Sequence, residues 1–328
     1  MSTILITGGA GFIGAHLAKR LVKDGHRITV VDNLARGESS RLSDIKEKIT
    51  FENIDLRYDF KKLLKISEGI DLIFHLAAIN GTENFYKHSD LVLDVGIFGM
   101  LNVLNTVEKN KIKNLIVASS AEVYQLAKKI PTPENTELKI PDPYEPRYSY
   151  AASKIISEQL ALAYLRSKRI QKAILFRPHN VYGPDMGNKH VIPQFLNRAS
   201  KIAKKKYKES FPIYGDGNET RAFCYIDDII DGLKIIMKKG KSGEIYHIGN
   251  DEEISIEHLF QIINKFHKDR LRLKFKKGVS GSPQRRCPEI SKMRNLGFSP
   301  KFNINDGLKK TKEWYEKNYK PEKNNKLL

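Results

Sequence analysis

The chain has 328 residues, of which 40% are hydrophobic and 29% charged, and its formal net charge at pH 7 is +19. This length allows one large α/β unit, or a main domain with a smaller partner, with a full hydrophobic core. No uninterrupted apolar run approaches the roughly 18 residues of a membrane span, and no signal peptide precedes the first predicted strand, so we expect a cytoplasmic protein. Two cysteines, Cys224 and Cys287, exclude a disulfide framework and a cysteine-based metal cluster. No metal is expected.

The excess positive charge comes mostly from lysines that are dispersed along the chain. No recognisable nucleic-acid module accompanies them, so we interpret them as solvated surface residues and expect neither a nucleic-acid nor a membrane partner. A basic field also attracts an anionic substrate or cofactor. The lysine-rich tail, residues 317–328, is expected to be frayed.

The first predicted strand, Thr3–Ile6, leads directly into a glycine-rich segment, Thr7-Gly8-Gly9-Ala10-Gly11-Phe12-Ile13-Gly14. Its glycines let the backbone turn sharply, approach a pyrophosphate and begin a helix that packs closely on the sheet. The N-terminus of that helix directs unpaired N–H groups at phosphates. We therefore predict a dinucleotide site with contacts from Gly8, Gly11, Phe12, Ile13 and Gly14.

The second predicted strand, Arg27–Val31, ends in Asp32. An acidic side chain at this place holds the ribose hydroxyls of the adenosine half, and it repels a 2′-phosphate. The predicted cofactor is therefore NAD rather than NADP. Asn33 and Arg36 follow and are expected beside the cofactor, and the arginine keeps NADP open as an alternative because arginine accommodates a 2′-phosphate.

Strands and helices continue to alternate through the first half of the chain. Further strands are predicted at Ile49–Asn53, Leu72–His75, Asn114–Ala118 and Ala173–Arg177, and helices at Phe12–Asp24, Phe60–Glu68, Leu91–Asn110 and Tyr150–Ser167. Beyond Pro178 the elements become short and are separated by Gly, Pro and Asn. The pattern predicts an α/β protein: a Rossmann-type doubly wound parallel sheet in residues 1–177, and a smaller α/β substrate lobe in residues 178–316 that returns in part to the main sheet.

The part of the chain that follows the fifth predicted strand contains three residues with the chemistry of a proton-transfer site. Ser120 follows that strand, and Tyr150 and Lys154 lie four residues apart on one face of a predicted helix. A lysine ammonium near a phenol favours the phenolate and lowers the pKa of the phenol, and the positive ring of oxidised nicotinamide adds to that effect. Such a phenol can take a proton from a sugar hydroxyl while a hydride leaves the same carbon, and Ser120 would hydrogen-bond the same oxygen.

With these motifs in place, the sequence resembles the extended short-chain dehydrogenase/reductase family, in its nucleotide-sugar epimerase and dehydratase branch. The resemblance runs from Thr7-Gly8-Gly9 to Trp314-Tyr315. It implies a catalytic triad of Ser120, Tyr150 and Lys154. It also implies that Asp55-Leu56 contacts adenine and that the segment His75-Leu76-Ala77-Ala78 lines the cofactor. Tyr150, Lys154 and Arg177 complete the expected cofactor contacts.

The resemblance also implies where the substrate binds. Asn180, within the segment Arg177–Pro184, matches the asparagine that binds the substrate diphosphate, and Arg221 and Arg285 match diphosphate-binding arginines. Guanidinium groups suit phosphate oxygens because they donate in pairs. The sugar is expected against Asn80, Thr82, Gln125 and His179, and the base near Val191, Ile192 and Tyr214. Two residues depart from the family pattern: Gly96 stands where asparagine is frequent, which removes a polar contact near the cofactor, and Gln125 stands where glycine follows the tyrosine, which alters the loop beside the substrate.

We predict a nucleotide-sugar epimerase, acting at C4 through a transient ketone. A 4,6-dehydratase or a UDP-glucuronate-type decarboxylase that uses Glu122 as acid or base is the alternative, since those groups carry glutamate at this place. An alanine at position 121, directly before Glu122, is similar to the epimerase pattern instead. A simple NAD-dependent reductase, and a non-catalytic NAD sensor that binds nucleic acid, are further alternatives. The family resemblance implies a homodimer through the two helices at Leu91–Asn110 and Tyr150–Ser167, with Leu101, Leu104, Ile156 and Leu160 compatible with the interface.

Overall fold

The computed structural model describes residues 1–188, 190–204, 210–277 and 283–318. Its centre is a seven-stranded sheet in the order β11-β6-β5-β4-β1-β2-β3, in which every pair of neighbours is parallel. The strands are β1 (Thr3–Thr7), β2 (Arg27–Val31), β3 (Ile49–Glu52), β4 (Leu72–His75), β5 (Asn114–Ala118), β6 (Ala173–Pro178) and β11 (Ile245–Ile248). The predicted doubly wound α/β fold is confirmed.

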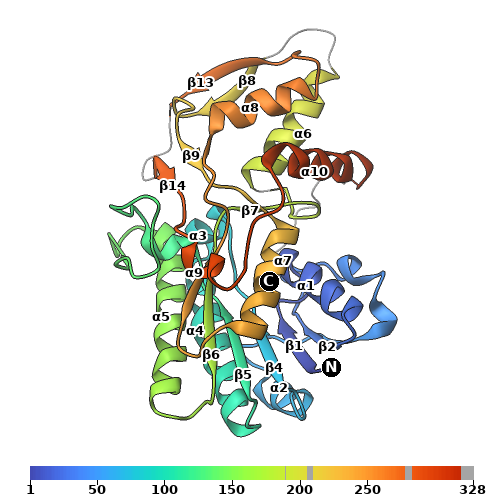
Figure 1. The fold of residues 1–328 in the computed structure, drawn as a ribbon, viewed down its shortest axis with the longest axis vertical. Coiled ribbons are helices and arrows are strands. Elements are labelled where there is room, and N and C mark those ends of the chain that lie inside the picture. The colour runs from blue at the N-terminus through green and yellow to red at the C-terminus, as the bar shows by residue number, and fades with distance from the viewer. Residues whose placement is uncertain (189, 205–209, 278–282, 319–328) are drawn as a thin grey trace.

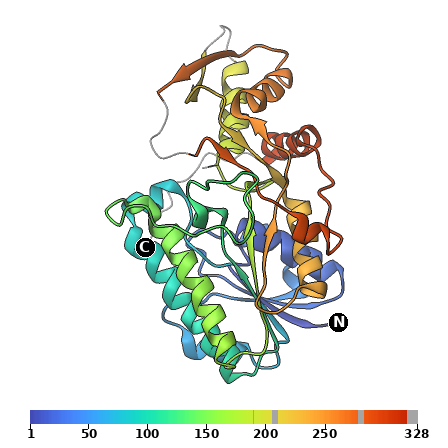
Figure 2. The ribbon, with the colours of Figure 1, turned by 60° about the vertical axis from the view of Figure 1, so that its left-hand side comes forward.

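Helices cover both faces of this sheet (Figures 1 and 2). One face carries α1 (Phe12–Lys23) and α7 (Ile226–Lys239), and the other carries α2 (Phe60–Ile66), α4 (Ser89–Lys109) and α5 (Ser149–Arg166). Successive strand residues serve opposite faces: Ile4 and Ile6 are buried with α1 and α7, whereas Leu5 is buried with α4 and α5. The strands therefore read as continuous apolar runs, as expected for a parallel sheet covered on both sides.

The second half of the chain forms the upper lobe in Figure 1 and also contributes β11 and α7 to the sheet layer. The lobe contains α6 (Val191–Ala203), α8 (Ile256–Lys265) and α10 (Ile304–Asn318), with α9 (Ser291–Arg294) beside β11. Its strands form small sheets from β7 (Val181–Tyr182), β8 (Ser210–Tyr214), β9 (Thr220–Arg221), β10 (Cys224–Tyr225), β12 (Ile254–Ser255), β13 (Arg272–Lys276) and β14 (Arg285–Arg286). Because α10 continues to Asn318, the expected fraying is wrong for residues 317 and 318, and the rest of that tail lies outside the described residues.

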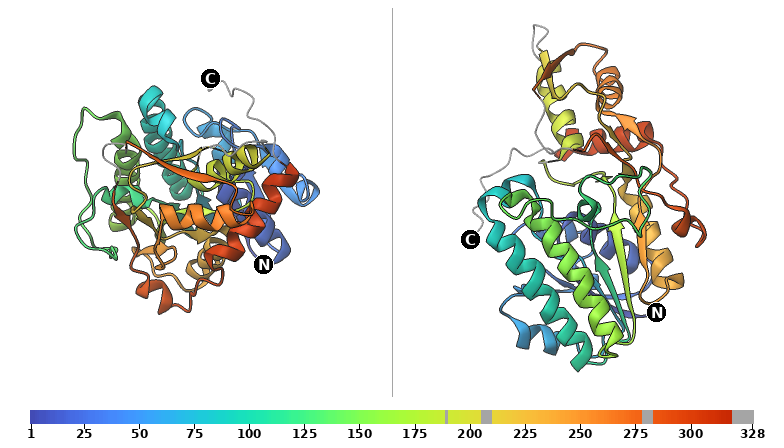
Figure 3. Two further views of the ribbon diagram at one scale, coloured as in Figure 1. Left: turned by 90° about the horizontal axis from the view of Figure 1, so that it is seen from above. Right: turned by 90° about the vertical axis from the view of Figure 1, so that its left-hand side faces the viewer.

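Helices α4 and α5 lie side by side along one face, as Figures 2 and 3 show. Gly96 makes this possible, because a Cβ at that position would lie 2.6 Å from the Cβ of Ser153, and the Ser157 hydroxyl donates to the Gly96 carbonyl at 3.1 Å. The departure at Gly96 thus serves helix packing. By length and composition α4 could cross a membrane, but half of its most apolar window is buried within the fold.

Candidate active site

The glycine-rich segment joins β1 to α1 in the way that the sequence predicted. Gly11 caps α1 with extended backbone and no side-chain bond, and the first turn of α1 has no acidic residue. A Cβ at Gly14 would overlap the carbonyl oxygen of Gly8, so only glycine lets the helix start this close to the loop. Phe12 and Ile13 begin the helix, and the unpaired N–H groups there suit a pyrophosphate.

Asp32 follows the last residue of β2, and its side chain holds this loop in place. Its carboxylate accepts the backbone N–H of Ala10 at 3.0 Å and that of Leu34 at 2.8 Å, and burial raises its pKa. Sequence reasoning missed Arg41, a buried guanidinium that donates to the Ala10 carbonyl at 3.2 Å and lies 3.2 Å from Asp185 Oδ1. Arg41 therefore ties the glycine loop to the lobe-side residue Asp185.

Arg36 does not turn toward the expected ribose position. Its Nη1 donates to the Asn80 carbonyl, and no contact with Asp32 holds it near a 2′-phosphate position. The geometry therefore favours NAD, whose ribose hydroxyls suit the Asp32 carboxylate, because Arg36 is bound to Asn80 instead.

The expected adenine end is assembled from β2 and from the loop after β3. Asn33 Nδ2 donates to Asp55 Oδ2 at 3.1 Å, and Arg57 holds the same carboxylate through Nε at 3.0 Å and Nη2 at 2.8 Å. The Leu56 side chain is buried in the core under α4, so only its backbone remains for a ligand. Leu76 is held beside the glycine loop because its N–H donates to the Thr7 carbonyl at 3.1 Å, which also brings Ala77 and Ala78 to this edge.

The structure brings the three predicted catalytic residues together at the carboxyl end of β5. The Ser120 hydroxyl hydrogen-bonds the Tyr150 hydroxyl. Lys154 is 3% exposed, and its Nζ donates to the Ala118 carbonyl at 2.8 Å and lies 5.8 Å from the centre of the Tyr150 ring. The Tyr150 ring stacks on Phe85 of α3 (Thr82–Lys87) at 5.3 Å, which fixes its orientation.

The expected lowering of the tyrosine pKa is not produced by the protein alone. Burial raises the pKa of Tyr150 to about 12, against the hydrogen bond from Ser120 and the charge of Arg36, both of which lower it. Burial also lowers the pKa of Lys154 to about 8, while Glu158 raises it. Without the cofactor, desolvation outweighs the groups that favour the phenolate, and the lowered pKa expected with NAD bound stays a prediction.

Glu122 lies in the short 3-10 helix η3 (Ala121–Tyr124) and is paired with an arginine of the other half of the chain. Arg286 donates to Glu122 through Nη1 at 2.5 Å and Nη2 at 3.3 Å. Burial raises the pKa of Glu122, but Arg286, Arg147 and Arg221 together hold it below its usual value. Burial and the like charge of Arg286 lower the pKa of Arg221 to about 10, so two guanidinium groups converge here.

The structure does not test whether Arg285 binds a diphosphate, so that role stays a prediction. The Arg285 side chain is 54% exposed and pairs with Glu253, which also accepts the hydroxyl of Thr220, the residue before Arg221. Its neighbour on β14, Arg286, faces inward, because successive strand residues point to opposite sides.

Arg177 was also wrongly predicted to contact the cofactor. It is 1% exposed, and its guanidinium binds Glu158 through Nε at 2.8 Å and Nη2 at 2.6 Å, while Nη1 donates to the Tyr124 hydroxyl and to the Glu134 carbonyl. The Tyr124 hydroxyl lies 2.6 Å from His247 Nε2, whose Nδ1 lies 3.0 Å from the Glu289 carbonyl. Arg177 therefore stabilises the floor of the site. Sequence reasoning missed this network, although Glu158 stands one helical turn after Lys154.

The residues expected around the sugar lie in different surroundings. His179 is 1% exposed, the centre of its ring lies 4.7 Å from that of His247, and neither of its ring nitrogens has a hydrogen-bond partner among the described residues. Asn180 has a φ of +39° and its amide donates to the Ala222 carbonyl at 3.3 Å. Gln125 has a φ of +51°, which explains why glycine would suit this position. Asn80 turns its carbonyl to Arg36, while Thr82 is exposed at the start of α3.

The three residues expected near the base lie in the lobe. Ile192 is buried in the core on α6, so its side chain does not reach a ligand, whereas Val191 beside it is half-buried. Tyr214 ends β8 and is 58% exposed.

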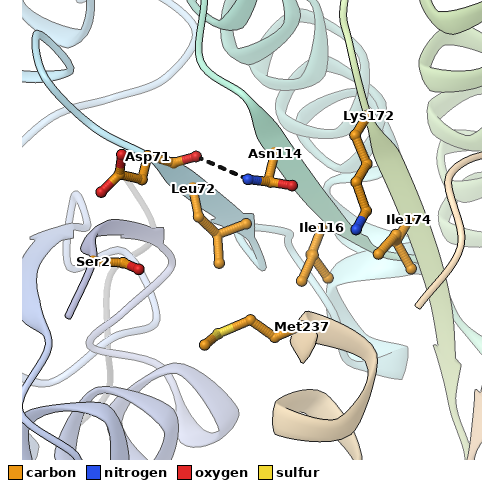
Figure 4. Close-up of a pocket in the computed structure, with 8 residues that line it drawn as sticks. All are labelled: Ser2, Asp71, Leu72, Asn114, Ile116, Lys172, Ile174 and Met237. Carbon is orange, nitrogen blue, oxygen red and sulfur yellow. Dashed lines mark hydrogen bonds between the residues drawn. The ribbon is translucent and has the colours of Figure 1, made fainter. Parts of the chain in front are cut away.

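A cavity of about 130 Å³ lies at the opposite, amino end of the sheet (Figure 4). Leu72 and Asn114 begin β4 and β5 there, and Lys172 immediately precedes β6, so the cavity is remote from Ser120 at the carboxyl edge. Among the described residues, no group of three or more His, Cys, Asp or Glu side chains is placed to hold a metal ion.

Comparison with known proteins identifies the family. The model of the NAD dependent epimerase/dehydratase family matches residues 4–249. A UDP-N-acetyl-alpha-D-glucosaminuronate decarboxylase of Bacillus cytotoxicus is 32% identical over 322 residues, which are 95% of this chain and 97% of the relative.

Two solved structures superimpose over nearly the whole chain. One is a UDP-glucose 4-epimerase of Thermotoga maritima with UDP-glucose, with a TM-score of 0.85, 28% identity, and coverage of 96% of this chain and 99% of that one. The other is the dTDP-glucose 4,6-dehydratase DesIV of Streptomyces venezuelae, solved with NAD, with a TM-score of 0.85, 27% identity, and coverage of 96% and 97%. The chain is thus similar to epimerases, dehydratases and decarboxylases alike, and it is an enzyme of the NAD-dependent epimerase/dehydratase family, an extended short-chain dehydrogenase/reductase with NAD as its cofactor.

Proposed function

We propose that this enzyme is a nucleotide-sugar 4-epimerase that works through a transient 4-keto sugar. The glycine-rich segment and Asp32 would hold NAD, which would supply the acceptor and donor of a hydride. Tyr150 takes the proton of the sugar hydroxyl and later gives it back, and Ser120 hydrogen-bonds at the same oxygen. Lys154 is fixed by the Ala118 carbonyl on the same face of α5.

The observation that carries the choice of epimerase is the pairing of Glu122 with Arg286. A 4,6-dehydratase needs a base for the C5 proton and an acid for the departing C6 hydroxyl. Glu122 is held ionised with its pKa lowered, so it is a weak base, and Ala121 offers no acid. Epimerisation requires neither group, only oxidation, turning of the ketone and reduction from the other face.

Arg221 and Arg286 support a nucleoside diphosphate as the part of the substrate that the enzyme binds. The two arginines are paired neighbours on β9 and β14. Burial and the charge of Arg286 lower the pKa of Arg221, and an inserted anion would relieve this repulsion. The solved epimerase with UDP-glucose has the same fold. We therefore infer that a nucleotide sugar binds with its diphosphate at these arginines.

A C6-decarboxylase is the second candidate, because Arg286 places a cation where the carboxylate of a uronic acid would be attracted. The relative from Bacillus cytotoxicus carries the name of such an enzyme. Loss of carbon dioxide from a 4-keto uronic acid needs no base, so a paired Glu122 does not exclude it.

Product analysis separates these candidates. The purified enzyme is incubated with UDP-, GDP-, CDP- and dTDP-sugars, including a UDP-uronic acid, and the products are followed by NMR and mass spectrometry. An inverted C4 with unchanged mass supports the epimerase. Loss of carbon dioxide, about 44 Da, supports the decarboxylase, and loss of water, about 18 Da, supports the dehydratase. Glu122→Gln is expected to keep epimerisation within a few-fold, whereas an elimination would collapse by orders of magnitude.

For the assembly we propose a homodimer through α4 and α5. Phe98 of α4 is 53% exposed, and Leu101, Ile156 and Leu160 are half-buried on the same helix pair, whereas Leu104 is fully buried in the core and is excluded from the interface. Light scattering after size exclusion should give a dimer for the wild type and a monomer for Phe98→Glu. The cytoplasmic location and the lack of nucleic-acid and membrane partners stay predictions.

A further inference from the structure

The peptide of Ala10, in the middle of the glycine-rich segment, is held from both sides. Its N–H donates to the Asp32 carboxylate at 3.0 Å. Its carbonyl accepts the backbone N–H of Glu38 at 3.0 Å and Arg41 Nη1 at 3.2 Å. Ala10 is fully buried, and the next residue, Gly11, caps α1. The shape of the loop that suits a pyrophosphate therefore depends in part on Arg41.

The guanidinium of Arg41 is buried and joins this loop to the second half of the chain. Arg41 belongs to the 3-10 helix η1 (Ser39–Leu42), and its side chain is 7% exposed. Its Nε lies 3.2 Å from Asp185 Oδ1, and its Nη2 lies 3.6 Å from Glu38 Oε1. The Asp185 side chain is 26% exposed and that of Glu38 is 59% exposed. Asp185 is thus the nearer and the less exposed of the two carboxylates that pair with this cation.

Asp185 lies in the connection between β7 and α6, through which the chain enters the lobe. Gly183 of this connection lies beside the glycine-rich segment, because a Cβ on it would be 3.6 Å from Phe12 Cζ at the start of α1. Two residues after Asp185, the Gly187 carbonyl accepts the hydroxyl of Tyr315 of α10 at 2.7 Å. The connection is therefore fastened to the lobe, and the pair of Arg41 with Asp185 joins it to the cofactor loop.

We infer that Arg41 is a positioning residue for the cofactor: by holding the Ala10 carbonyl and pairing with Asp185, it ties the glycine-rich loop to the lobe and slows the release of NAD. Moving the connection away from the loop would leave the buried guanidinium with only Glu38 as a carboxylate partner, which is costly for a charge removed from water. A reaction that removes a hydride and returns it to the same sugar needs the dinucleotide to stay bound throughout a turnover. The inference goes beyond the proposed function, since it does not depend on which sugar is converted.

The test measures how fast the dinucleotide leaves. Wild type and variants are loaded with NADH, an excess of NAD is added, and the decay of the fluorescence of bound NADH gives the dissociation rate. Arg41→Met removes the guanidinium, and Asp185→Asn removes only the charge of its partner at the same size, at a position whose φ of +62° asparagine tolerates. We expect each variant to release NADH about tenfold faster, as for the loss of one interaction with a charged group. The double variant should be about as fast as Arg41→Met alone, because both changes break the same link.

Arg20→Met is the matched control. Arg20 Nη1 lies 2.7 Å from Asp231 Oδ1 and joins α1 to α7, but this pair does not touch the glycine-rich loop, so the rate should stay within about twofold of the wild type. All rates are taken at a temperature at which circular dichroism shows the variants folded.

An unchanged rate in Asp185→Asn overturns the inference, even where Arg41→Met is faster, because the link to the lobe would then have no influence. A lower melting temperature of the variants without faster release overturns it as well, since Arg41 would then be only a structural residue. Independent effects that multiply in the double variant, or an equal effect in the control, also contradict it. If Arg41→Met does not fold, Asp185→Asn and its control decide. Because the measurement uses no sugar, a failure of the proposed function shows separately, as the lack of turnover of every nucleotide sugar by the wild type.

Discussion

The buried ion pair between Arg177 and Glu158 leads to a prediction about stability. Both side chains are 2% exposed, and two hydrogen bonds of 2.8 and 2.6 Å join them. Arg177→Met leaves the Glu158 carboxylate buried without its hydrogen-bonded guanidinium partner and also removes the donor to Tyr124. Breaking one side of a buried pair costs about 3–5 kcal/mol, because the charge that remains has lost its water and its partner.

The chain contains a matched control for this experiment. Arg169 and Glu108 form a pair with the same two-bond geometry, at 2.8 and 2.6 Å, but their side chains are 41% and 33% exposed. Arg169→Met should therefore cost less than about 1 kcal/mol, because water replaces the lost partner. The double variant Arg177→Met/Glu158→Leu should recover most of the loss, since no buried charge remains.

The free energy of unfolding is measured by urea denaturation, followed by circular dichroism, for the wild type and the variants. Equal losses in Arg177→Met and Arg169→Met would refute the reasoning, because burial would then have no influence on the cost. A double variant less stable than Arg177→Met would contradict the account of an uncompensated buried charge.

Three further predictions concern other parts of the fold. Gly14→Ala should abolish NAD binding, measured by tryptophan fluorescence or calorimetry, because the added methyl group overlaps the Gly8 carbonyl; retained tight binding would contradict this. Gln125→Gly should raise the melting temperature by about 2 °C, as it relieves a backbone with φ +51° in a non-glycine residue, and a lower melting temperature would count against that strain. Burial lowers the pKa of His75 and of His247 to about 3, so the folded state resists protonation of both side chains. The free energy of unfolding should therefore be highest above pH 6.5. As the pH drops from 6.5 toward 3, it should fall by about 1.4 kcal/mol per pH unit for each histidine. Urea midpoints that are equal at pH 7.5 and pH 5.5 would contradict this last prediction.

Most of the sheet was predictable because its central strands are buried on both faces and therefore consist of apolar runs. Six of the seven strands were predicted, including the edge strand β3, whose residues are half-buried or exposed. The seventh, β11, is a four-residue segment, and nothing local shows that it pairs with β6 rather than within the lobe. Its place is decided by tertiary packing under α7.

The site was predictable where a local motif carries the chemistry, and less so where strand register decides. Ser120, Tyr150 and Lys154 lie on a strand end and one helix face, so spacing alone brings them together. Arg285 and Arg286 are neighbours on a strand, and only the register of β14 with β9 shows which one faces inward. Arg177 lies in a segment that matches the family pattern, but its guanidinium donates to Glu158 instead of a cofactor, and this partner is nineteen positions away in the sequence.

The fate of a C4-bound label tests the central claim most directly. The enzyme is incubated with a nucleotide sugar carrying deuterium at C4, and the product is examined by NMR. The account predicts an inverted C4 that keeps its deuterium, with none exchanged into water, and no product in Tyr150→Phe. Loss of the label to solvent, or undiminished turnover by Tyr150→Phe, would contradict it.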